Sequence, residues 1–135
     1  MDQDQFVQVE AELQGGALKI RVKALKSVTL TELQGNTADL EAFGASMPAN
    51  FRKINFGDGV EIPDGMKEDI EVMNKFQFRW GCAIPIKDGE EVTVSIPATA
   101  SGNERAVFTL AYEFPKFLGL WKGKSAIYVK YGAAA

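Results

Sequence analysis

A strict alternation of apolar and polar side chains over residues 7–24 constrains the fold of this chain most. Apolar side chains occupy the odd positions of VQVEAELQ (7–14) and the even positions of ALKIRVKA (17–24). A period of two is typical of strands with one buried face. Gly15-Gly16 separates the two segments, and glycine adopts the positive φ angles that a two-residue hairpin turn requires. The segment therefore predicts a β-hairpin.

The length of that turn predicts the register of the hairpin, because a two-residue loop places Gln14 opposite Ala17. On one face this register pairs apolar side chains: Leu13 with Leu18, Ala11 with Ile20 and Val9 with Val22. On the other face it pairs Glu12 with Lys19, Glu10 with Arg21 and Gln8 with Lys23. We interpret these six polar residues as a solvated face, and as an interface with a neighbouring subunit if the ribbon lies at a sheet edge.

The middle of the chain predicts several further short elements. The alternation slips at Leu25-Lys26, which indicates a bulge or corner where the chain passes from one sheet toward another. Residues 35–43 predict a short helix that Asn36 or Thr37 caps and Gly44 ends. Residues 51–56 predict a short strand. Apolar side chains at most even positions of 70–86 predict one long strand, or two collinear strands with a break at Gly81.

The last third of the chain predicts more strands in the same phase. Three-residue loops at 88–90 and 101–103 would keep the apolar residues of three successive strands on one face, as in an antiparallel meander. A last strand is expected over 125–131, and residues 132–135 are expected to form a loose tail.

About eight or nine short strands with little helix predict an all-β fold, an antiparallel β-sandwich of jelly-roll or immunoglobulin-like topology. The 135 residues fit one domain, and we find no internal repeat or linker.

The absence of histidine restricts the chemistry of the chain. It excludes Ser-His-Asp and Cys-His catalysis and histidine-ligated metal sites. Cys82 is the only cysteine, so it cannot build a thiolate zinc site, and its apolar surroundings indicate a small buried side chain. We therefore expect no enzymatic activity, no metal site and no cofactor.

The net charge and the hydropathy of the chain limit the kinds of partner that it can bind. The 15 basic and 18 acidic residues give a net charge of −3, which argues against a general nucleic-acid binder. No run approaches the length of about 20 apolar residues that a membrane span needs, and the acidic start lacks a signal-peptide pattern. We expect no stable membrane insertion and a cytoplasmic or virion location.

The segment FPKFLGLWKGK (114–124) is the main candidate for a partner-binding site. It crowds apolar side chains into a glycine-bearing connection flanked by lysines, whereas connections usually expose polar residues. It either covers the end of the core or forms an exposed apolar patch with a basic rim. The candidate residues are Phe117, Leu118, Leu120, Trp121, Lys122 and Lys124.

Two other features are candidate sites. Six acidic residues over 58–71 could bind calcium or supply a carboxylate pair, but their spacing matches no EF-hand and we interpret them as solvated. Trp80 and Trp121 could stack on sugar rings, although Trp80 continues an inward-facing series and is expected in the core.

These features together predict a non-enzymatic structural or interaction module. We expect it to bind copies of itself or another protein, by self-association or by decorating a larger assembly such as a viral or phage shell. The alternative is a module that binds carbohydrate or another small ligand.

Overall fold

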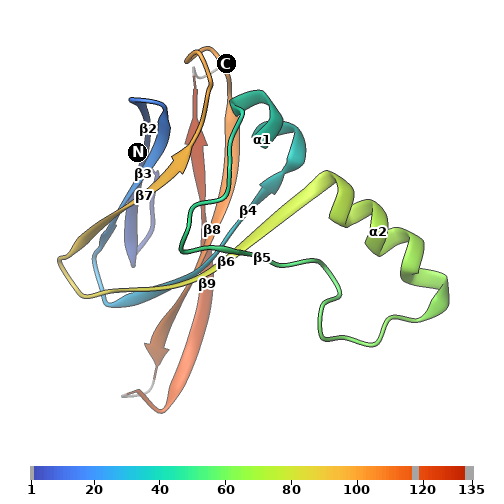
Figure 1. Cartoon of the computed structure of the whole chain (residues 1–135). Helices are drawn as coiled ribbons and strands as arrows, with labels where there is room; N and C mark the ends of the chain where they lie inside the picture. Colours follow the sequence, from blue (N-terminus) through green and yellow to red (C-terminus); the bar gives the residue numbers. More distant parts are fainter. Residues whose placement is uncertain (1, 117–118, 133–135) are drawn as a thin grey trace.

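The computed structural model describes residues 2–116 and 119–132, which form two antiparallel β-sheets (Figure 1). Sheet A has the strand order β1-β2-β3-β7 and sheet B has the order β5-β6-β4-β8-β9. The strands are β1 (Asp2–Gln3), β2 (Val7–Gln14), β3 (Ala17–Ala24), β4 (Val28–Asn36), β5 (Arg52–Lys53), β6 (Gln77–Ile86), β7 (Glu91–Pro97), β8 (Ala106–Lys116) and β9 (Trp121–Tyr131). The helices are α1 (Thr37–Phe43), the 3₁₀ helix η1 (Asp64–Met66) and α2 (Lys67–Phe76). The predicted all-β sandwich is confirmed.

The hairpin of β2 and β3 has the predicted register throughout. Gln14 pairs with Ala17, and the ladder continues without a shift to Val7 and Ala24. Gly15 and Gly16 have φ angles of 56° and 79°, as the turn requires. The predicted corner after this hairpin is also confirmed, because β3 belongs to sheet A and β4 to sheet B.

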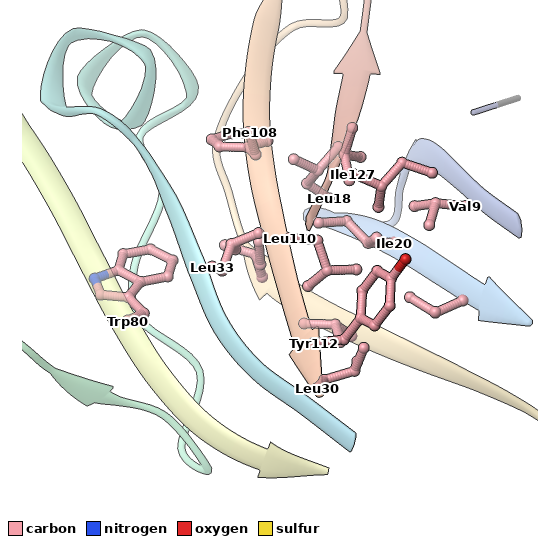
Figure 2. Close-up of a cluster of buried hydrophobic side chains, with 14 of the residues drawn as sticks. Val9, Leu18, Ile20, Leu30, Leu33, Trp80, Phe108, Leu110, Tyr112 and Ile127 are labelled. Atoms are coloured by element: carbon pink, nitrogen blue, oxygen red, sulfur yellow. The ribbon is translucent and has the colours of Figure 1, made fainter. Parts of the chain in front are cut away.

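The core lies between the inner faces of the two sheets (Figure 2). Leu18 and Ile20 of sheet A lie close to Leu110 and Tyr112 of sheet B, and each is at most 1% exposed. Trp80 is 6% exposed on the inner side, as its place in the inward series predicted. The two sheets therefore bury one face each, as the alternating patterns require.

One buried polar group ties the start of the chain to this core. The Tyr112 hydroxyl donates a hydrogen bond to Asp4, whose other carboxylate oxygen accepts the Phe6 and Val7 amides. Burial and the bond to Asp4 raise the pKa of Tyr112 to about 12. The tyrosine is thus neutral and satisfied although its ring is buried.

The helix predicted over 35–43 is confirmed as α1, which ends at Gly44 in a left-handed conformation with φ of 57°. Asn36 is the residue before the helix, as predicted, but its side chain makes no capping hydrogen bond. The short strand predicted over 51–56 is present only as β5, Arg52–Lys53.

The long strand predicted over 70–86 is wrong for its first part. Lys67–Phe76 form α2, and the strand β6 begins at Gln77. Ile70 and Asn74 are the half-buried residues of α2, four positions apart on one helical face, so the period of 3.6 was hidden beneath a chance alternation. β6 continues through Gly81, but its pairing with β4 shifts there, between Leu30 and Glu32.

The predicted meander is also wrong. β7 pairs with β3 in sheet A, whereas β6 and β8 each pair with β4 in sheet B. Alternation shows which side chains face the core, and two strands on opposite sheets satisfy it as well as two neighbours do. The last strand, β9, is longer than the predicted 125–131 because it begins at Trp121. Of the predicted tail, residues 133–135 lie outside the described residues.

Gly35 of β4 lies in close contact with two aromatic rings, and a substitution there measures how tightly they are packed. A Cβ at this position would lie 2.8 Å from Phe78 Cε1 and 3.1 Å from Phe108 Cδ1, and both rings are buried. We expect Gly35→Ala to lower the free energy of unfolding by about 1–3 kcal/mol, because the rings must move apart. Urea denaturation measures this.

The matched control is Gly65→Ala in η1, where a Cβ would meet no atom within 4 Å. Its free energy of unfolding should stay within about 0.5 kcal/mol of the wild-type value. A Gly35→Ala protein as stable as this control would contradict the tight contact.

Candidate interaction surfaces

The hairpin of β8 and β9 extends beyond the sheet that supports it (Figure 1). The last residue pair between β4 and β8 is Thr29 with Glu113, whereas β8 and β9 remain paired as far as Lys116 and Trp121. A two-stranded ribbon therefore continues past the start of β4. We call residues 114–116 and 119–124 the β8–β9 tip.

Aromatic packing supports the base of this tip. The Phe114 ring stacks on Phe6, with 4.1 Å between ring centroids and 22° between ring planes. Gly123 lies opposite Phe114 in the ladder, where a Cβ would clash with the ring. An isolated two-stranded ribbon is only marginally stable, so this stack accounts for the order at the base.

The outer part of the tip is exposed. Leu120 is 80% exposed and Trp121 is 65% exposed. The Lys122 ammonium is 4.0 Å from the Glu113 carboxylate and its side chain remains 78% exposed. Of the six predicted residues, Leu120, Trp121, Lys122 and Lys124 are exposed at the tip, while Phe117 and Leu118 lie outside the described residues. By strand alternation Trp121 lies on the same face of the ribbon as Phe114, and Lys122 and Lys124 lie on the other face. The alternative that these four residues cover the end of the core is wrong.

A hollow of about 300 Å³ adjoins the tip. It is lined by Ser27 just before β4, Thr29 from β4, Pro85 from β6, Glu113 and Phe114 from β8, and Trp121 from β9. Only Trp121 of these six residues was among the predicted site residues. Ser27, Thr29, Pro85 and Glu113 lie outside the predicted segment, and the sheet order β6-β4-β8 brings them together. The hollow is open, with an aromatic wall and a few polar groups at its side.

The charged face of the β2–β3 ribbon is only partly at a sheet edge. Lys19, Arg21 and Lys23 lie on β3, which β7 covers, so the interpretation of these residues as an edge is wrong. Gln8 pairs with Gln3 of β1. Among the described residues, β2 has no strand partner on its outer side beyond Val9, which leaves Glu10 and Glu12 near an open edge. The Glu10 carboxylate forms an ion pair with Arg21, with 2.7 Å between Glu10 Oε2 and Arg21 Nη2.

A third surface escaped prediction. Residues 54–76, which we call the α2 module, connect β5 to β6, and the helix α2 projects away from the two sheets (Figure 1). The Asn74 side chain holds the module together, since it accepts a hydrogen bond from the Phe56 amide at 2.6 Å and donates one to the Phe56 carbonyl at 3.3 Å. Gly57 lies against Ile62 and Ile70, which form its small interior.

The far side of α2 exposes apolar side chains. Val72, Met73 and Phe76 are 54%, 36% and 59% exposed, and their spacing places them on one side of the helix. Ile70 and Asn74 occupy the side that faces the rest of the module. A helix with a second, unpaired apolar side is unusual on a protein surface and marks a place where another molecule can bind.

The α2 module contacts the outer face of sheet B beside a buried ion pair that joins β4 to β6. Glu32 is 7% exposed and accepts hydrogen bonds from Arg79 Nε at 3.0 Å, Arg79 Nη2 at 2.6 Å and the Gln34 amide. The Arg79 guanidinium lies 5.0 Å from the centre of the Phe56 ring. Because Glu32 has several donors, this pair is a structural contact and leaves no unpaired charge for catalysis.

A grouping of side chains that could hold a metal ion is not found in the described part of the chain. Over residues 2–116 and 119–132, no three Cys, Asp or Glu side chains are grouped so that they could hold a metal ion. No described helix is long and apolar enough to cross a membrane. Comparisons of the chain with protein-family models, curated proteins and solved structures find no match.

Cys82 is a partly buried thiol whose Sγ lies 3.5 Å from the Leu30 carbonyl oxygen. Burial, with a smaller effect from the Glu32 carboxylate, raises the pKa of this thiol from 9.0 to about 11. The reactive thiolate is therefore scarce near neutral pH, in keeping with a packing role.

This pKa predicts slow alkylation of the folded protein. At pH 8 the thiolate fraction of Cys82 should be about a hundredfold lower in the folded than in the urea-unfolded chain, and labelling with iodoacetamide followed by mass spectrometry measures the ratio of rates. The unfolded state loses the thiol proton first, so the free energy of unfolding should fall as the pH rises from about 9 toward 11. Equal labelling rates in the two states would contradict the assigned burial.

Proposed function

We propose that the protein is a non-enzymatic structural or interaction module that acts by self-association or by decorating a larger assembly. The observation that supports this most is the β8–β9 tip, which presents Leu120 and Trp121 to solvent at the end of a ribbon that the sandwich does not cover. Exposed tryptophan on a rigid element is a frequent anchor of protein interfaces. The surrounding lysines add a basic rim, which can steer a partner of opposite charge.

The fold suits such a role. β-Sandwiches present free strand edges and hairpins to neighbours, and pairing along an edge is a common way to build assemblies from small all-β subunits. A viral or phage shell, or a tail-like tube, is the kind of assembly we expect, with the protein in the cytoplasm or the virion. This part of the proposal is an analogy between folds and rests on no chemistry of the site.

The tip can be tested by its oligomeric state. Trp121→Ser should raise the apparent dissociation constant of self-association at least about tenfold, because it removes an anchor of that interface. Size-exclusion chromatography with light scattering over a range of concentrations measures the change. The matched control is Tyr128→Ser, which removes an aromatic residue of similar exposure, 63%, from the same strand but away from the tip.

Two outcomes would count against this use of the tip. Equal weakening by both substitutions would assign the effect to β9 in general. A wild-type chain that stays monomeric at every concentration and binds no protein partner would reject the proposed function.

The hollow beside the tip supports a second candidate function. An aromatic wall formed by Phe114 and Trp121, with Glu113 and Ser27 near it, resembles in its chemistry a shallow site for a sugar or another small polar ligand. Binding on a glycan array that Trp121→Ser abolishes and Tyr128→Ser retains would favour this function over self-association.

A further inference from the structure

The charges of this chain are separated into two regions of opposite sign. The α2 module, residues 54–76, carries six acidic and two basic side chains, a net charge of −4. One of the two basic side chains, Lys75, has its ammonium 5.6 Å from the centre of the Phe76 ring. From Phe114 to Tyr131 the sequence has four lysines, Lys116, Lys122, Lys124 and Lys130, and no acidic residue. Glu113, just before this stretch, pairs across the strands with Lys124 and lies 4.0 Å from Lys122, so it offsets part of this charge. A chain with a total of only −3 thus has a strongly acidic segment and a strongly basic one.

The topology places these two regions at opposite edges of sheet B. In the order β5-β6-β4-β8-β9, the acidic α2 module is inserted between β5 and β6 at one edge, and the basic strand β9 forms the other edge. Three strands separate them in the sheet, so the two regions cannot neutralise each other within one rigid copy. They can do so between two copies.

Both regions also expose apolar side chains that need cover. The tip offers Leu120 and Trp121, and α2 offers Val72, Met73 and Phe76. Asp69 lies within the apolar side of α2 by helical spacing, and Glu68 borders it. The two surfaces therefore match in two respects: each exposes apolar side chains, and the net charges of the two regions have opposite sign.

We propose that the β8–β9 tip of one copy of this chain docks on the α2 module of a second copy. This inference rests on the proposed function, since it names the partner of the tip. A tip against a tip would bring lysines together, and a helix against a helix would bring carboxylates together, so the symmetric contacts are disfavoured by charge. The contact is therefore head-to-tail, and repeated contacts of this kind produce a closed ring or an open filament.

A charge exchange between two variants of the full chain tests this contact. Lys122→Glu with Lys124→Glu makes the tip acidic, and Glu68→Lys with Asp69→Lys makes α2 basic. The control, Glu41→Lys with Glu90→Lys, changes the net charge as much as the second variant does, but on α1 and on the connection before β7. Sedimentation velocity at low and at high salt measures association.

We expect each charge variant alone to raise the dissociation constant at least about tenfold, because each gives its two surfaces the same sign. The control should associate like the wild type. An equimolar mixture of the two charge variants should associate again, because the acidic tip meets the basic helix and the basic tip meets the acidic helix. Wild-type association should weaken as salt rises. Electron microscopy of the wild type should then show rings or filaments.

Recovery in the mixture also shows that both variants are folded. If circular dichroism shows that the helix variant is unfolded, the variant Val72→Ser with Phe76→Ser takes its place. This variant should not associate with itself, because its α2 lacks the apolar side chains that the tip would contact.

Three outcomes would overturn the inference. If the helix variant associates like the wild type while the tip variant does not, the tip binds another surface, and the proposed function survives without this contact. If two folded variants fail to associate when mixed, charge pairing between the surfaces is rejected. If the wild type is monomeric and its tip binds heparin or single-stranded DNA, the partner of the tip is a polyanion and not a second copy. Self-association would then be rejected as well.

Discussion

The contact between the inner faces of the two sheets is the interaction on which the other features depend. Each sheet buries its inner face in the shared core. The chain crosses from sheet A to sheet B after β3, returns to sheet A for β7 and crosses again before β8. The strands of sheet A have at most 8 residues, whereas β8 and β9 have 11 each. The extra length has no opposing sheet, and the β8–β9 tip is its direct result.

The outer face of sheet B is covered by a different means. The chain leaves β4 through α1, returns as β5 and then forms the α2 module before it enters β6. Gly81 provides room for the Ile54 side chain on that face, and the Glu32–Arg79 pair closes the contact beneath the Phe56 ring. A small number of specific contacts thus attaches the module at its base and leaves the far side of its helix open.

The sequence predicted those parts of the fold in which local pattern and turn length agree. The register of β2 and β3 followed from Gly15-Gly16, and α1 followed from a capping pattern that ends in a glycine. The pairing of β7 with β3 could not be predicted, because strands on opposite sheets bear the same alternation. For the same reason the sequence could not predict that Lys19, Arg21 and Lys23 lie on an interior strand of sheet A.

The candidate surfaces show the same limit. The crowding of apolar residues near Trp121 was visible in the sequence, but only the overhang of β8 and β9 decides that they are exposed and not in the core. The apolar side of α2 was visible in principle at helical spacing, through Met66, Met73 and Phe76. It was hidden because Ile70, Val72, Asn74 and Phe76 also alternate, which favoured a strand.

The amide of Asn74 makes the α2 module sensitive to chemical ageing. One side chain both accepts from and donates to the backbone of Phe56, which is possible only for a group with a carbonyl oxygen and an amino group. Deamidation to aspartate would keep the acceptor, remove the donor and place a negative charge against the Phe56 carbonyl oxygen. The hold on the α2 module would then loosen while the contact between the two sheets stayed intact.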